Sequence, residues 1–74
     1  MKYYMGTQFV PNKGEAQMFY EVDDNETVLR TLTYITGTGE LDKVPDPIVK
    51  RLIRKEVLSE VEESAFMELW NKDS

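Results

Sequence analysis

Residues 1 to 44 alternate between strand-like runs and turn residues. Lys2 to Val10 is rich in tyrosine, threonine, phenylalanine and valine, a composition that favours a strand. Pro11 to Gly14 combines a fixed φ with residues that tolerate positive φ, so it predicts a turn. Ala16 to Val22 is then expected to run back antiparallel, and the two strands form a hairpin.

A second turn and two further strands are predicted after the hairpin. Asp23 to Glu26 has poor strand propensity and side chains that hydrogen-bond their own backbone. The pattern then predicts a third strand over Thr27 to Thr36, a tight turn at Gly37 to Gly39 and a short edge strand over Glu40 to Val44. Residues 1 to 44 are therefore predicted to form an antiparallel meander of three or four strands.

The third strand carries an arginine among apolar residues. Because strand side chains alternate, one face should hold Val28, Arg30, Leu32 and Tyr34, and we expect it to meet the core. An arginine in this position must reach solvent or meet an acceptor. We expect Arg30 to lie at the core edge or to pair with a carboxylate such as Glu21. The alternative is a clamp for a phosphate or carboxylate ligand.

The hydrophobic period changes at Asp46-Pro47. Aspartate is a good N-cap and proline is favoured at the first helical position, so an amphipathic helix is predicted over residues 46–58. Its apolar stripe would consist of Ile48, Val49, Leu52, Ile53 and Val57. Its opposite side would carry a basic strip made of Lys50, Arg51, Arg54 and Lys55.

A second helix is predicted over residues 60–72. Ser59 and Glu62 have the spacing of a capping box, and the acidic residues that follow Ser59 suit the positive end of a helix dipole. These acidic residues include Glu60, Glu62 and Glu63. Apolar residues then fall on one face, which we expect to dock onto the sheet. The expected core anchors are Tyr20, Leu32, Phe66, Leu69 and Trp70.

These elements predict an α+β fold. A three- to four-stranded antiparallel β-meander needs a cover for its apolar face, and the two C-terminal helices are the available cover. With 74 residues and no linker-like segment, the chain is expected to be a single small domain over residues 1–74.

The composition argues against an enzyme. The chain has no cysteine and no histidine, so it lacks the commonest catalytic side chains and the usual ligands of zinc. We expect no metal site and no cofactor. The acidic turn lacks the glycine and the closing glutamate of an EF-hand loop, which favours a solvated turn over a calcium site.

Charge and hydropathy limit the possible partners. The net charge is −5, made up of −3 in residues 1–44, +2 in residues 45–58 and −4 in residues 59–74. An acidic chain is repelled by phosphate backbones, so direct nucleic-acid binding is not expected.

No apolar run is long enough to span a bilayer, and the N-terminus lacks a signal-peptide pattern. We expect a cytoplasmic protein, in a bacterial cell or a phage-infected host.

The chain has more aromatic residues than a small core can bury. Neighbours such as Tyr3 and Tyr4, or Phe19 and Tyr20, should point to opposite sheet faces. One face is therefore expected to expose aromatic side chains, which favours a homo-oligomer or a partner surface.

Short motifs in the chain resemble a family of small bacterial domains of uncharacterised function. The motifs are Tyr20 to Asp24, the strand with Arg30 that ends at Gly37, and the terminal Phe66-x-x-Leu69-Trp70. The likeness covers roughly residues 18 to 39 and 59 to 70 and leaves out the predicted helix 46–58. It implies a small accessory domain of the immunity or phage type, with the target left open.

These observations favour a small non-enzymatic binding protein that blocks a larger partner protein, of immunity or phage anti-defence type, in the manner of anti-CRISPR inhibitors. The alternative is a small-ligand binder or an oligomeric sponge for a nucleotide signal. The candidate partner-binding residues are Arg30, Lys50, Arg51, Arg54, Lys55, Glu60, Glu62 and Glu63.

Overall fold

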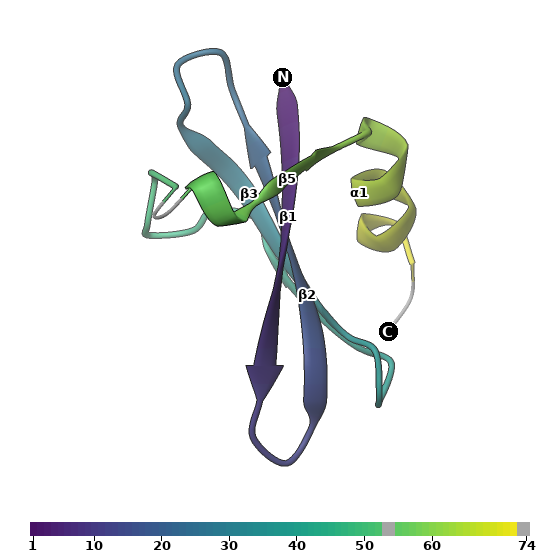
Figure 1. The fold of residues 1–74 in the computed structure, drawn as a ribbon. Helices are drawn as coiled ribbons and strands as arrows, with labels where there is room; N and C mark the ends of the chain where they lie inside the picture. The colour runs from purple at the N-terminus through teal and green to yellow at the C-terminus, as the bar shows by residue number, and fades with distance from the viewer. Residues whose placement is uncertain (53–54, 73–74) are drawn as a thin grey trace.

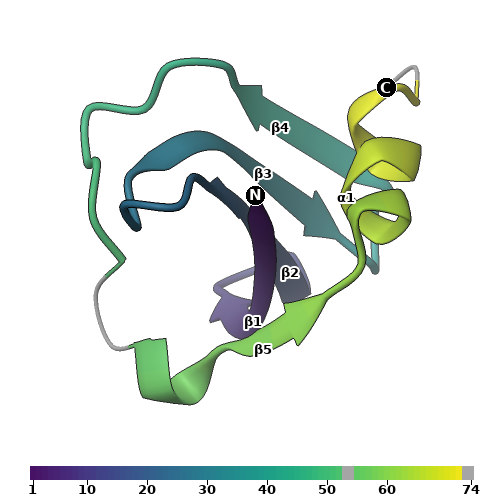
Figure 2. The same cartoon turned by 90° about the horizontal axis from the view of Figure 1, so that it is seen from above.

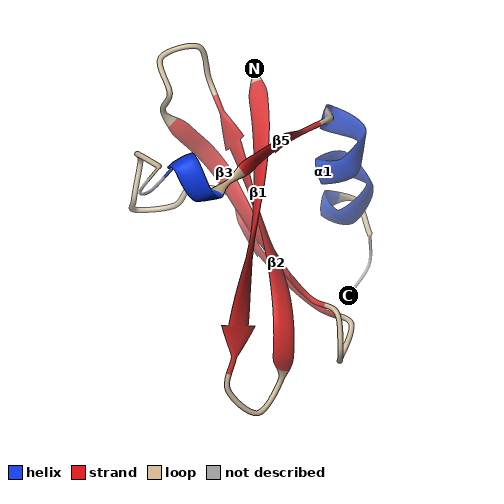
Figure 3. Cartoon of the chain, in the orientation of Figure 1, coloured by secondary structure: helices blue, strands red, loops and turns tan. Residues whose placement is uncertain are grey.

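The computed structural model describes residues 1–52 and 55–72 of the chain. These residues form one antiparallel sheet and one short α-helix (Figures 1 and 3). In chain order the elements are β1 (Lys2–Val10), β2 (Gly14–Val22), β3 (Val28–Ile35), β4 (Glu40–Val44), the 3₁₀ helix η1 (Lys55–Val57), β5 (Ser59–Val61) and α1 (Glu63–Trp70). The strand order across the sheet is β4-β3-β2-β1-β5.

Turn chemistry sets the first hairpin. The backbone N–H of Lys13 donates to the carbonyl of Val10 at 3.0 Å, and Asn12 and Gly14 take φ values of 69° and 97°. Asparagine and glycine tolerate these left-handed values better than other residues do. β1 and β2 then pair along their whole length, from Lys2 opposite Val22 to Val10 opposite Gly14.

A β-bulge interrupts the pairing of β2 with β3. Glu21 lies opposite Arg30, whereas Val22 lies opposite Val28, so Leu29 is an extra residue in β3. The bulge reverses the alternation at this end of the strand. Val28 therefore packs with Tyr4 and Val22, away from the face that carries Arg30 and Leu32, which differs from the single face predicted for this strand.

The sheet has a small core on each face. On the α1 side, Tyr3, Phe19, Leu32 and Phe66 form one buried cluster. On the other side, Tyr4, Val22 and Val28 are buried with Leu52 and Leu58 packed against them. Figure 2 shows α1 on one side of the sheet and the chain that follows β4 on the other. Tyr3 and Tyr4 are both buried, whereas Phe9 is 72% exposed, so the expected exposure of aromatic side chains is seen at Phe9 and not at these two tyrosines.

The predicted fold, a meander of three or four strands covered by two C-terminal helices, is wrong. The sheet has five strands, and α1 is the single α-helix within residues 1–52 and 55–72. The predicted helix 46–58 does not form, since its described part is irregular chain with one 3₁₀ turn, η1. The backbone there bonds to the sheet instead: the N–H of Val28 donates to the carbonyl of Lys50 at 2.7 Å, and Thr27 bridges to Arg51.

The second predicted helix is shorter than expected. Residues 60–72 were predicted to be helical from a capping box at Ser59, but Ser59 to Val61 form β5 and pair with Met5 to Tyr3 of β1. The helix begins at Glu63, with Glu62 as its N-cap residue and no hydrogen bond from that side chain. The backbone bonds offered by the β1 edge replace the first turn of the predicted helix.

No helix in the described part of the chain is long and apolar enough to cross a membrane.

Candidate functional site

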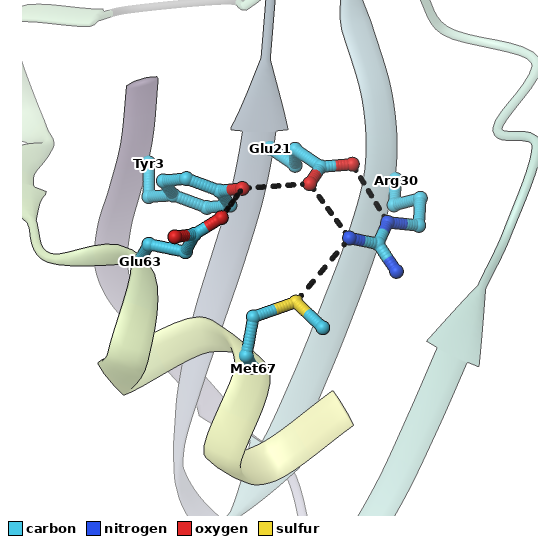
Figure 4. Close-up of polar contacts among 5 residues, drawn as sticks. All are labelled: Tyr3, Glu21, Arg30, Glu63 and Met67. Carbon is cyan, nitrogen blue, oxygen red and sulfur yellow. Dashed lines mark hydrogen bonds and ion pairs between the residues drawn. The ribbon is translucent and has the colours of Figure 1, made fainter. Parts of the chain in front are cut away.

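Arg30 and Glu21 form a bidentate ion pair between neighbouring strands (Figure 4). Nε of Arg30 donates to Oε1 of Glu21, and Nη2 donates to Oε2, both at 2.6 Å. The regular register of β2 and β3, which ends at the bulge, places the two residues directly opposite each other, on the face that α1 covers. The hydrogen bond from Arg30 lowers the pKa of the Glu21 carboxyl, and the same bond raises the pKa of Arg30.

Tyr3 of β1 extends this network. Its hydroxyl donates to Oε2 of Glu21 at 2.9 Å and lies 3.2 Å from Oε2 of Glu63 on α1 (Figure 4). Burial, together with the nearby Glu21 carboxylate, raises the pKa of Tyr3 to about 12. Both oxygens of the buried Glu21 are therefore bonded to a donor.

Side chains of α1 cover Arg30 from the other side. Its guanidinium carbon lies 5.1 Å from the centre of the Phe66 ring and 4.6 Å from that of Trp70, and Nη2 is 3.4 Å from the sulfur of Met67. Cation–π contacts of this kind favour a guanidinium that has given up much of its water. Arg30 thus joins the sheet to the helix, and its donors that face Glu21 are already occupied.

The residues of the predicted basic strip lie apart from Arg30. Lys50 pairs with Asp46, and Lys55 pairs with Glu26 at 2.6 Å. Arg51 is exposed and forms no ion pair within residues 1–52 and 55–72. Arg54 lies outside the described residues. Because no helix forms here, the strip is not one continuous helical face.

The acidic candidates lie near the start of α1. Glu60 is exposed on β5, Glu62 is the exposed N-cap residue, and Glu63 begins the helix. Of these three, Glu63 contacts the Arg30 network, through Tyr3.

Among the expected core anchors, Leu32 and Phe66 are fully buried, whereas Tyr20, Leu69 and Trp70 are partly exposed.

A largely apolar groove lies on the sheet face opposite α1. It has a volume of about 500 Å³ and lies between the strands and the chain that follows β4. The sheet side of this groove is formed by Tyr20, Val28, Thr31 and Val44. The other side is formed by Pro47, Ile48 and Val49, with Asp46 and Arg51 as its charged residues. We refer to these nine residues as the apolar groove.

Two aliphatic residues of the apolar groove face solvent. Ile48 is 95% exposed and Val49 is 59% exposed, although the sequence pattern assigned both to the apolar stripe of a predicted helix. Pro47 beside them is buried. Burying an isoleucine or valine side chain is worth about 1.5 to 3 kcal/mol, so these positions are a favourable place for an apolar contact.

The contact between Tyr3 and Glu63 and the irregular backbone at Pro45 to Pro47 had only weak signals in the sequence pattern. Tyr3 and Glu63 were not expected to meet, because their contact depends on β5 bringing α1 back across the sheet. The flanking Pro45 and Pro47 were the available sign that this segment would not be an ordinary helix, since prolines restrict the residue before them to extended backbone.

The acidic turn has a structural role. Oδ1 of Asp23 accepts hydrogen bonds from the backbone N–H groups of Asn25 and Thr27, each at 2.9 Å. Among the described residues, no group of three or more acidic side chains could hold a metal ion.

Comparisons of the chain with models of known protein families, with curated proteins and with solved structures found no match.

Proposed function

We propose that this chain is a small non-enzymatic binding protein that blocks a larger partner protein, of immunity or phage anti-defence type, and that the apolar groove is its contact surface. The observation that carries the proposal is the exposure of Ile48, at 95%, beside a groove of about 500 Å³. Exposed apolar area next to a concave surface is typical of protein-interaction sites.

Charge around the groove supports an acidic edge on the partner. Arg51 is exposed beside the groove and has no ion-pair partner among residues 1–52 and 55–72. Lys50 is engaged by Asp46 in an exposed pair. Exposed pairs of this kind are worth only about 0 to 1 kcal/mol, so a partner carboxylate could replace Asp46 at little cost. The expected partner surface therefore combines aliphatic side chains with acidic residues.

A small-ligand binder is the second candidate. The volume of the groove, about 500 Å³, falls within the roughly 300 to 1,000 Å³ typical of ligand pockets. Its lining favours a ligand with an apolar body and one anionic group near Arg51. A nucleotide held by Arg30 has less support, because Glu21 already binds that guanidinium through two hydrogen bonds.

The test begins with purification of the tagged chain from its source host under native conditions. We expect one protein to co-purify in stoichiometric amount and to lose its own activity when bound. Ile48→Asp should weaken this complex at least tenfold, since a carboxylate replaces a buried aliphatic contact, which corresponds to about 1.4 kcal/mol or more.

Val57→Asp is the matched control. Val57 is 58% exposed, much like Val49, but it does not line the apolar groove. This variant should keep the affinity of the parent chain. An unchanged affinity in Ile48→Asp would contradict the assignment of the surface, and a bound small molecule without a protein partner would favour the second candidate.

A further inference from the structure

The outer edge of β1 is only partly covered. β2 pairs with β1 over all nine positions from Lys2 to Val10, but β5 pairs only with Tyr3, Tyr4 and Met5 on the other side. No residue in the described part of the chain forms a β-bridge with the outer edge of Gly6 to Val10, although the Leu58 side chain packs against Gly6. Figure 1 shows the β1–β2 hairpin extending beyond β5 toward its turn. Alternate residues of this stretch therefore direct backbone N–H and C=O groups outward without a partner.

This edge lacks the usual protection against strand pairing. Native edge strands are commonly guarded by charged residues, prolines or bulges. β4, at the opposite edge of the sheet, carries Glu40, Asp42 and Lys43 within five residues. Gly6 to Val10 contains no charged residue and no proline, and Thr7, Gln8 and Phe9 are exposed. Phe9 is 72% exposed.

We propose that the edge Gly6–Val10 pairs antiparallel with the same edge of a second copy of this chain. In an antiparallel ladder, two residues directly opposite each other either both direct their backbone N–H and C=O groups toward the other strand or both direct them away from it. Neighbouring residues along a strand alternate between these two orientations, so a residue cannot lie opposite the copy of its own neighbour. A two-fold axis must therefore pass through a residue position, not between two residues. An axis at Gln8 uses the whole free stretch, with Gly6 opposite Val10, Thr7 opposite Phe9 and Gln8 opposite Gln8.

The ends of the stretch fit this register. β5 occupies the edge as far as Met5, and the chain turns away at Pro11, the residue that would lie opposite Met5 of the other copy. The ladder therefore ends at the same place on both strands. The pairing joins two five-stranded sheets into one continuous sheet and leaves the apolar groove free, so the inference is separate from the proposed function.

Charge favours a second copy at this position. Each chain carries a net charge of −5, so most surfaces of two copies repel each other. This register places no like charges opposite each other. Phe9 opposite Thr7 is an aromatic–β-branched pair, and the Gln8 amides offer both donors and acceptors to each other across the axis. The edge is thus complementary to itself, as a two-fold interface requires.

The test is sedimentation velocity of the purified chain from about 10 μM to about 1 mM, a range suited to the weak affinity expected of so small an interface. We expect a reversible monomer–dimer equilibrium. Gln8→Lys and Gln8→Glu should each raise the dimer dissociation constant about tenfold, because each puts like charges opposite each other at the axis. An equimolar mixture of the two variants should recover the dimer as a mixed pair.

Thr38→Lys is the matched control, because it makes the same change of net charge at an exposed turn away from this edge. It should dimerise as the parent chain does. Hydrogen exchange of the parent chain gives a reading without any variant: backbone amides within Gly6–Val10 should become protected as the concentration rises.

Three results would overturn the inference. The first is that the chain sediments as a monomer at every concentration. The second is that both Gln8 variants dimerise with the same dissociation constant as the parent chain. The third is that the exchange rates of the backbone amides within Gly6–Val10 do not depend on concentration.

Discussion

At the scale of single residues, Glu21 determines what Arg30 can do. A buried carboxylate is costly unless its oxygens are bonded, and here Arg30 and Tyr3 supply three hydrogen bonds to it. Because Arg30 forms these hydrogen bonds and is covered by Phe66 and Trp70, we infer that it stabilises the folded domain.

Arg30→Ala should lower the free energy of unfolding by about 3 to 5 kcal/mol, since it leaves Glu21 buried without its cation. Urea denaturation measures this loss. Combining Arg30→Ala with Glu21→Leu should recover part of it, because no buried charge then remains. An Arg30→Ala variant as stable as the parent chain would contradict the structural role.

The pH dependence of stability follows from the lowered pKa of Glu21. In the unfolded chain the pKa of this carboxyl is about 4.3, and in the folded chain its pKa is lower. The ionised carboxylate therefore contributes its full stabilisation at pH values above the pKa of the unfolded chain. The free energy of unfolding should therefore fall as pH drops below about 5. Urea titrations at several pH values would show this decrease.

Glu21→Gln is the variant for this measurement. It should be less stable than the parent chain near neutral pH and should show a shallower acid decrease. Other paired carboxylates, those of Glu26, Glu40 and Asp46, also have lowered pKa values, so some decrease should remain. An identical acid profile in the variant and the parent would count against the role of Glu21.

At the scale of elements, α1 is held mainly by one residue. Phe66 is fully buried between Tyr3 and Trp70, with ring centres 5.3 Å and 5.7 Å away. Trp70 is partly exposed and stacks on the outer side of Phe66. The helix is only eight residues long, too short to be stable in water without this packing.

Phe66→Ala should cost about 3 to 5 kcal/mol, whereas Trp70→Ala should cost less, about 2 kcal/mol, because part of its ring is already in water. Thermal and urea unfolding of the two variants give the comparison. Leu69→Ala, also at a partly buried position, serves as a control of similar exposure. A larger loss for Trp70→Ala than for Phe66→Ala, or none for Trp70→Ala, would contradict this packing.

The described residues between β4 and β5 show why the helix predicted over residues 46–58 does not form. Its apolar spacing fits a helix, but the bulge at Leu29 disturbs the β2–β3 ladder, and the N–H of Val28 bonds to the carbonyl of Lys50. A carbonyl bonded to the sheet is not available for a helical turn. The bonds to the sheet edge therefore outweigh the preference of a short isolated helix, which is marginal in water.

At the scale of the whole molecule, the two proposed contact surfaces are separate. The apolar groove lies on the sheet face opposite α1, and the edge Gly6–Val10 lies at the free side of the β1–β2 hairpin. Substitutions at distant sites without shared neighbours usually act independently. Ile48→Asp should therefore leave the monomer–dimer equilibrium unchanged, and Gln8→Lys should leave the affinity for the partner protein unchanged.

Sedimentation velocity and binding titrations on both variants, and on the double variant, measure this independence. The effects of the double variant should equal the sum of the single effects. A loss of dimer in Ile48→Asp would mean that the groove takes part in self-association.

The sequence by itself determined the first four strands, with bounds within two residues of those observed, because strand alternation and turn chemistry are local. Lys2–Val10 and Glu40–Val44 agree with the pattern at both ends. It also determined that an apolar helix lies near the C-terminus and that Glu21 is an available partner for Arg30. Only the tertiary structure decided the bulge at Leu29, the conformation of the described residues between β4 and α1, and the covering of both sheet faces. These depend on which backbone groups remain unpaired once the strands have assembled, and no local pattern records that.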